Sequence, residues 1–150
     1  MHIGHINLAK SFNGAGEHFV SLVEALREQG VRQYVLVRNM ALAKRLDLVD
    51  NVTAGPAVRS AVMAYCLMPQ VDVVHIHDPS DGQAGLLLTL TRSIPFVLTL
   101  RDDAPGKNPL TRAVYRRASG IIYQSDADAA KHLRVYRHAV ETWREAALSP

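Results

Sequence analysis

The chain has 150 residues, of which 48% are hydrophobic and 21% are charged, and its net charge is +3. This length and composition suit one globular domain, and they exclude coiled-coil, collagen-like and low-complexity proteins because no matching repeat occurs. The single cysteine, Cys66, excludes an internal disulfide framework, and its apolar neighbours predict a small core residue. The longest uncharged apolar stretch, residues 84–91, is far shorter than the roughly 20 residues of a membrane span, and residues 1–7 lack the order of a signal peptide. We therefore expect a cytoplasmic protein.

The positive charge is concentrated in the last third of the chain. Residues 1–106 carry 9 basic and 10 acidic side chains, whereas residues 107–150 carry 8 basic and 4 acidic ones. Two interpretations remain open: a solvated helical face, or a surface for an anionic membrane or a phosphorylated acceptor at the inner face of the membrane. The second would use the arginines of this region, Arg112, Arg116, Arg117, Arg134 and Arg137. Nucleic acid is not an expected partner, because no recognition motif appears and aromatic residues make up only 6%.

Short β-branched runs alternate with longer amphipathic stretches, which is typical of a parallel α/β sheet. Strands are predicted at residues 3–7, 34–37, near 52, 71–77, 95–100 and 120–123. Helices are predicted from residue 17 to before Gly30, around 41–46, at 58–67, 82–92 and 109–118, and from 126 into the tail. We therefore expect a single α/β domain over residues 1–150: a doubly wound parallel sheet between two layers of helices.

Polar and small residues follow four of these strands at the ends where doubly wound sheets bind ligands. They are Asn13, Gly14, Ala15, Gly16 and Glu17 after the first strand, His77 and Asp78 after the fourth, Arg101, Asp102 and Asp103 after the fifth, and Ser125 after the last. The carboxyl ends of parallel strands lie at one edge of the sheet, so this pattern predicts one shared site.

The segment from Gly14 to Gly16 opens a predicted helix. Small residues let a ligand approach the backbone, and the N–H groups at a helix start favour an anion such as phosphate. A dinucleotide fingerprint would need a glycine where Phe19 stands and an acid where Arg38 and Asn39 stand, and no P-loop lysine follows. The alternative is a tight strand-to-helix turn that binds nothing.

The histidines of the fourth strand, His75 and His77, alternate onto the same side of that strand. An H-x-H pair can ligate a metal, but no third and fourth ligand follow at a recognisable spacing, so we expect no metal. We expect instead a buried, hydrogen-bonded His75 and a His77 that faces the site. Asp102 and Asp103 suit a general base or acceptors for sugar hydroxyls, or else they only solubilise a loop.

Together these motifs resemble the amino-terminal half of GT-B glycosyltransferases of the family 4 type. The family's glycine-rich loop and helix correspond to residues 13–30, its D-V-V-H-x-H strand end to 72–77, its I-P-x-V-x-T strand to 94–99, and its Ser-capped helix to the region after 121. The resemblance covers nearly the whole chain. Two departures are Ala15, where the family has a second glycine, and Arg101, where it more often has histidine.

The resemblance implies a Rossmann-like domain that forms half of a GT-B fold. It implies transfer of a sugar from a nucleotide-diphosphate sugar to a glycan or lipid-linked acceptor, as in polysaccharide or lipopolysaccharide biosynthesis, with the donor as co-substrate and no cofactor. GT-B proteins hold the acceptor on this half and most of the donor on a second domain, whose E-x7-E element is absent from residues 1–150. The chain would then be inactive alone, and the same gene or a separate subunit would supply the donor-binding domain.

The resemblance also assigns roles to residues. His77, Arg101 and Asp102 would be the catalytic residues and would position the acceptor hydroxyl and nearby anionic groups. The segment from Gly14 to Gly16 would lie near the donor diphosphate. The remaining substrate-binding residues would be Asn13, Glu17, Asp78, Asp103 and Ser125. Two other functions stay open: a non-catalytic module that pairs with a partner subunit, and a nucleotide-binding Rossmann protein, which the missing third glycine disfavours.

Overall fold

A computed structural model describes residues 1–10, 14–100 and 108–123 of the chain. Six parallel strands form one sheet in the order β3-β2-β1-β4-β5-β6. The strands are β1 (His2–Asn7), β2 (Arg32–Val37), β3 (Val52–Ala54), β4 (Val73–Ile76), β5 (Phe96–Leu100) and β6 (Gly120–Tyr123). The helices are α1 (Gly14–Glu28), α2 (Met40–Leu46), α3 (Ala61–Leu67), α4 (Gly82–Arg92), α5 (Pro109–Arg117) and the short 3₁₀ helix η1 (Pro79–Asp81).

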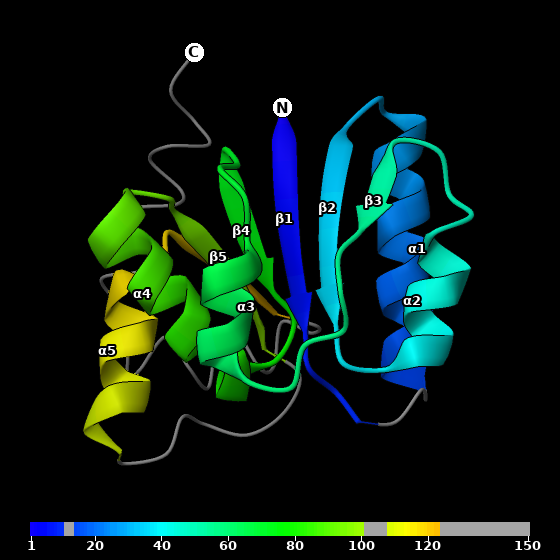
Figure 1. The fold of residues 1–150 in the computed structure, drawn as a ribbon. Helices are drawn as coiled ribbons and strands as arrows, with labels where there is room; N and C mark the ends of the chain where they lie inside the picture. Colours follow the sequence, from blue (N-terminus) through cyan, green and yellow to red (C-terminus); the bar gives the residue numbers. More distant parts are fainter. Residues whose placement is uncertain (11–13, 101–107, 124–150) are drawn as a thin grey trace.

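Helices cover both faces of the sheet (Figure 1). α1 and α2 lie on one side and α3, α4 and α5 on the other. On the first side Phe19, Val23 and Leu46 pack against Val35 and Val37 of β2. The larger cluster, on the other side, includes Ile6, Leu36, Ile76, Leu88, Phe96, Leu98 and Tyr115. Alternate residues of one strand point their side chains into the two different clusters, because successive side chains of a strand lie on opposite faces of the sheet. The predicted doubly wound, three-layer architecture is confirmed.

The order of the strands reverses between β1 and β4. The chain builds β1, β2 and β3 outward in one direction and then returns to place β4 on the other side of β1. All strands run the same way, so their carboxyl ends share one edge of the sheet, the lower edge in Figure 1. In sheets of this kind the connections after the two central strands separate at that edge, which is where ligands bind.

The predicted elements are present in the described ranges, with differences at their ends. α4 and β6 have the predicted bounds, and Gly30, with φ of +73°, follows the end of α1 as expected. α1 begins at Gly14 rather than at residue 17, so the small residues form its first turn and not a loop. α3 begins at Ala61 rather than at residue 58, because the Ser60 hydroxyl accepts the Met63 N–H and caps the helix there. The helix expected from residue 126 lies outside the described residues.

The prediction that Cys66 is a core residue is wrong. Its side chain is exposed, and the residue of α3 that is buried is Ala64. Residues two positions apart in an α-helix are separated by about 200° around its axis. Ala64 and Cys66 therefore face opposite sides of α3. The apolar neighbours of the cysteine are therefore shared between an inner and an outer face. Among the helices in the described ranges, none combines the length and hydropathy that crossing a membrane requires.

Candidate functional site

Three histidines meet in the middle of the sheet, on the face that α1 covers. His5 lies in β1, His75 lies in β4, and His77 directly follows β4; all three are buried. The ring centroid of His77 is 4.0 Å from that of His75 and 5.3 Å from that of His5. The ring of Phe19 from α1 packs edge-on against His77, with centroids 4.4 Å apart. As predicted, His75 and His77 lie on the same side of the sheet, and His5 extends the pair to a cluster.

Hydrogen bonds connect this cluster to both neighbouring strands and to α1. His5 Nε2 is 3.1 Å from Gln33 Oε1 in β2, and His5 Nδ1 is 3.1 Å from His77 Nε2. The Gln33 amide nitrogen donates to the Val23 carbonyl of α1 at 2.9 Å. His75 Nε2 is 2.6 Å from Thr99 Oγ1 in β5. The expectation of a buried, hydrogen-bonded His75 is confirmed, and His77 is also buried, with 3% of its surface exposed.

Burial sets the protonation of His5. Loss of solvent, with a smaller contribution from the nearby His75, lowers the pKa of His5 from 6.5 to about 3, although the Gln33 hydrogen bond opposes this shift. His5 is therefore a neutral imidazole at physiological pH. A neutral ring carries one N–H and one lone pair, so each of its two hydrogen bonds has a fixed direction.

The cluster also has the composition of a transition-metal site. One ligand nitrogen from each of the three histidines lies within 4.8 Å of the others. Neutral imidazoles are common ligands of Zn²⁺, and three of them with one open position make a known type of zinc site. Both ring nitrogens of His5 already have hydrogen-bond partners within the chain. That the chain takes no metal remains a prediction.

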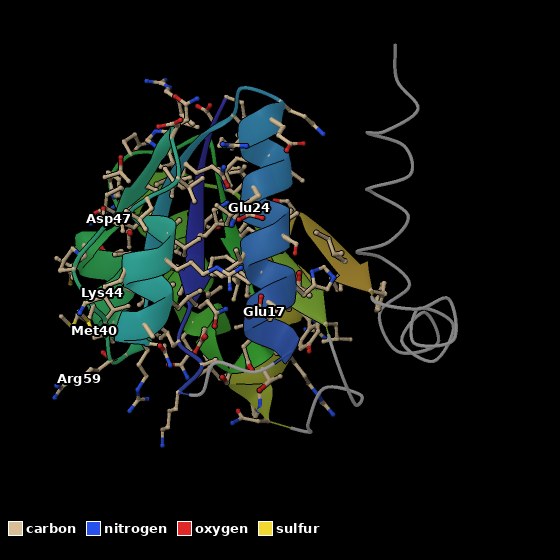
Figure 2. The ribbon with its side chains drawn as sticks, turned by 90° about the vertical axis from the view of Figure 1, so that its right-hand side faces the viewer. Glu17, Glu24, Met40, Lys44, Asp47 and Arg59 are labelled. Carbon is tan, nitrogen blue, oxygen red and sulfur yellow. The ribbon has the colours of Figure 1, made fainter. Side chains whose placement is uncertain are left out.

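The first turn of α1 lies at the same edge of the sheet as the end of β4. It contains Gly14, Ala15, Gly16 and Glu17, four of the predicted substrate-binding residues. Figure 2 shows Glu17 near the lower end of α1. Its two carboxylate oxygens each lie 3.1 Å from Arg45 Nη1 of α2. Glu17 thus complements the dipole of α1 and joins α1 to α2 on the surface.

Two aspartates organise the connections that leave β1 and β4. The Asp78 carboxylate accepts the Ser80 N–H at 2.8 Å and caps η1. The carboxylate of Asp81, at the end of η1, accepts the Leu8 N–H at 3.0 Å, which ties the segment after β1 to the segment after β4. Burial raises the pKa of Asp81 from 3.8 to about 6, while the Leu8 hydrogen bond opposes this shift.

The structure therefore brings together one part of the predicted site. Gly14 to Glu17, His77 and Asp78 lie where β1 and β4 end. The other predicted residues lie outside the described residues: Asn13, Arg101, Asp102, Asp103 and Ser125. Sequence reasoning missed His5, Gln33 and Asp81. Polar side chains inside apolar strands were a signal for the first two, whereas an aspartate in a loop gives no signal of its burial.

Comparisons with known proteins agree with this architecture. The model of the glycosyl transferase 4-like domain matches residues 13–142. Crystal structures of Anabaena Alr3699/HepE in complex with UDP and in complex with UDP-glucose have a similar fold, with TM-scores of 0.70 and 0.68 at 15% and 17% sequence identity. These alignments cover 93% and 89% of this chain but only 42% and 40% of the HepE chain. No curated protein matches the chain.

The family match and the arrangement of the sheet point the same way. The matched range begins before α1 and continues beyond β6, so it includes five of the six strands, the first turn of α1 and the end of β4. Two of the motifs that carried the resemblance, residues 72–77 and 94–99, fall on the neighbouring strands β4 and β5. The chain belongs to the family of glycosyl transferase 4-like domains.

Proposed function

We propose that residues 1–150 form the acceptor-binding half of a glycosyltransferase that moves a sugar from a nucleotide-diphosphate sugar to a glycan or lipid-linked acceptor. The observation that carries this proposal is the family match, together with His77 and the first turn of α1 at the switch point between β1 and β4. The fold of HepE, which was crystallised with UDP-glucose, supports the class of donor.

The roles follow from the chemistry of the site residues. The backbone N–H groups of Gly14, Ala15 and Gly16 at the start of α1 would stabilise the negative charge that develops on the leaving diphosphate. His77, Arg101 and Asp102 would together position the acceptor hydroxyl. Arg101 is a fixed cation where the family more often has a neutral imidazole, so an acceptor with an anionic group is favoured.

A second domain would complete the site. The chain aligns with only 42% of the HepE chain, so the donor would bind largely to a part supplied by the same gene or by a separate subunit. Alone, residues 1–150 would bind acceptor without transferring sugar. The reaction would take place at the cytoplasmic face of a membrane, with the nucleotide sugar as co-substrate and no cofactor.

Binding and turnover of the 150-residue chain test this proposal separately. Calorimetric titration with a panel of soluble oligosaccharides should give saturable binding to at least one of them, and incubation with UDP-glucose and that oligosaccharide should release no UDP. His77→Ala should weaken the binding about tenfold, the loss of roughly one hydrogen bond. His2→Ala, at the opposite edge of the sheet, is the control and should leave it unchanged.

Two outcomes would contradict the proposal. Micromolar binding of UDP or NAD by the chain, without binding of any oligosaccharide, would favour the nucleotide-binding Rossmann protein. Sugar transfer at an ordinary enzymatic rate would show that residues 1–150 are not half of a site.

A further inference from the structure

We infer that Gln33 and His5 are positioning residues that hold the His77 imidazole in one tautomer, with its hydrogen on Nε2 and its lone pair on Nδ1. Gln33 comes from β2, His5 comes from the neighbouring strand β1, and His77 directly follows β4 on the other side of β1; α1 anchors these three buried side chains. The tautomer is a property of the chain itself; only its use in catalysis rests on the proposed function.

The direction of the hydrogen bonds is set at α1. The Val23 carbonyl can only accept, so the group 2.9 Å from it must be the NH₂ of the Gln33 amide. The orientation of the amide is thereby fixed, and its oxygen is the atom that lies 3.1 Å from His5 Nε2. A carbonyl oxygen also only accepts. His5 must therefore carry its hydrogen on Nε2.

The next step follows from the charge of His5. Its pKa of about 3 leaves the ring neutral, so with a hydrogen on Nε2 its Nδ1 has only a lone pair. His5 Nδ1 is 3.1 Å from His77 Nε2, and a hydrogen bond there requires the donor to be His77. His77 therefore holds a hydrogen on Nε2, and in its neutral form the lone pair is on Nδ1.

Packing keeps the three groups in these orientations. The exposed fractions of His5, Gln33 and His77 are 0%, 1% and 3%. A buried polar group that loses its partner is destabilised, so turning the Gln33 amide or the His5 ring over would be penalised at each bond. The ring of Phe19, 4.4 Å from that of His77 and nearly perpendicular to it, restricts rotation of His77 as well.

For sugar transfer, this arrangement defines which atom of His77 can act. Nδ1 would be the atom of His77 that takes the proton of the acceptor hydroxyl as its oxygen bonds to the anomeric carbon of the donor sugar, while the bond from that carbon to the leaving nucleoside diphosphate breaks. The imidazolium would then donate a charge-assisted hydrogen bond from Nε2 to His5 Nδ1, which stabilises the protonated form. Gln33 and His5 would thus act through His77, without contacting the substrate.

A metal ion would require the opposite arrangement. If the cluster bound Zn²⁺ through His5 Nδ1 and His77 Nε2, both nitrogens would direct lone pairs at the metal, and His77 could not carry a hydrogen on Nε2. The position of the hydrogen on His77 therefore distinguishes the two uses of the same residues.

Long-range ¹H–¹⁵N NMR spectra of the full 150-residue chain, labelled at histidine, measure this hydrogen directly. At pH 7.5 the His5 and His77 rings should each show a protonated Nε2 and an unprotonated Nδ1, with a scalar coupling across the bond between His77 Nε2 and His5 Nδ1. Gln33→Leu, which removes the acceptor for His5, should give His77 as a mixture of tautomers. Gln33→Glu should restore the single tautomer when its carboxyl group is protonated, because the hydroxyl then donates to the Val23 carbonyl and the other oxygen accepts from His5.

Thr99→Val is the matched control, because it removes a hydroxyl that is hydrogen-bonded to His75 and leaves the Gln33–His5–His77 contacts in place. It should not change the tautomer of His77. A wild-type His77 with its hydrogen on Nδ1, or a His77 Nε2 whose resonance moves to that of a coordinated nitrogen on addition of one equivalent of Zn²⁺, would overturn the inference. The spectrum of the wild-type chain alone shows which nitrogen of His77 carries the hydrogen, so the test does not depend on whether a variant folds. It is recorded without substrate, so a failure of the proposed function would leave its result unchanged.

Discussion

At the residue scale, two buried groups make stability depend on pH in opposite directions. His5 has a lower pKa in the folded chain, about 3 against 6.5, so the unfolded chain binds more protons below pH 6.5 and stability falls as the pH drops from there. Asp81 has a higher pKa in the folded chain, about 6 against 3.8, so its contribution to stability falls as the pH rises from 3.8 to 6. Between about pH 4 and 6 the two effects oppose each other.

The variant Asp81→Asn separates the pH effect of Asp81 from that of His5. Asparagine can still accept the Leu8 N–H, but it does not titrate. The free energy of unfolding of the variant minus that of the wild type should increase by about 1–2 kcal/mol between pH 4 and 6, then stay level above pH 7. Urea unfolding at pH 4, 5, 6 and 7 measures this difference. Asp50→Asn, at an exposed position, is the control. A difference for Asp81→Asn that is constant or decreases over this range would contradict the assignment of a buried, titrating carboxyl.

Only the part of the site that depends on local contacts could be predicted from the sequence. The period of two in a strand placed His75 and His77 on one side of the sheet, as the structure confirms. His5, by contrast, meets His77 across 72 positions in the sequence, because β1 pairs with β4. Asp81 is buried by a contact with Leu8 across 73 positions. Local patterns contain no information on pairings of this kind.

At the scale of elements, the starts of helices were the least predictable feature. Glycine is a weak helix former, so the segment from Gly14 to Gly16 reads as a loop. In the structure this segment is the first turn of α1, which is held by the burial of Phe19 against β2 and by the Glu17–Arg45 pair with α2. The bounds of α4 were predicted correctly because Gly82 and Arg92 enclose one uninterrupted run without proline.

The contact between α4 and β5 makes a test of packing possible. A Cβ atom at Gly85 would lie 2.6 Å from Cγ of Phe96, so α4 rests directly on the phenyl ring. Gly85→Ala should lower the free energy of unfolding by about 1–3 kcal/mol, because one of the two elements must shift. Gln83→Ala, at an exposed position of the same helix, should raise it slightly or leave it unchanged. Urea unfolding of both variants measures this, and equal stabilities would contradict the close packing.

The basic surface of α5 allows membrane binding to be tested at this scale. Arg112, Arg116 and Arg117 are exposed on α5, and the other arginines predicted to join them lie outside the described residues. If this surface docks on an anionic membrane, flotation with phosphatidylserine liposomes should decrease in the double variant Arg112→Glu/Arg116→Glu and with rising salt. Arg32→Glu, exposed at the start of β2, should float like the wild type. Flotation that is equal for all three proteins would indicate a solvated helical face.

At the scale of the whole molecule, the pattern of strands and helices was sufficient for the fold. Six β-branched runs separated by helical segments predicted a doubly wound sheet, and the strand order β3-β2-β1-β4-β5-β6 confirms it. The likeness to HepE extends over 93% of the chain at only 15% identity, so what is shared is mainly the architecture. Which sugar and which acceptor are used depends on individual side chains, and the fold does not determine them.

The most direct test of the acceptor-binding site is where an acceptor perturbs the molecule. Backbone ¹H–¹⁵N spectra of the 150-residue chain, titrated with the oligosaccharide that binds in calorimetry, should show changes concentrated at Gly14 to Glu17, His77 and Asp78, at the ends of β1 and β4. UDP alone should not saturate any amide in the micromolar range. Changes centred instead on His2 and Arg32, at the opposite edge of the sheet, or saturation by micromolar UDP alone, would contradict the account.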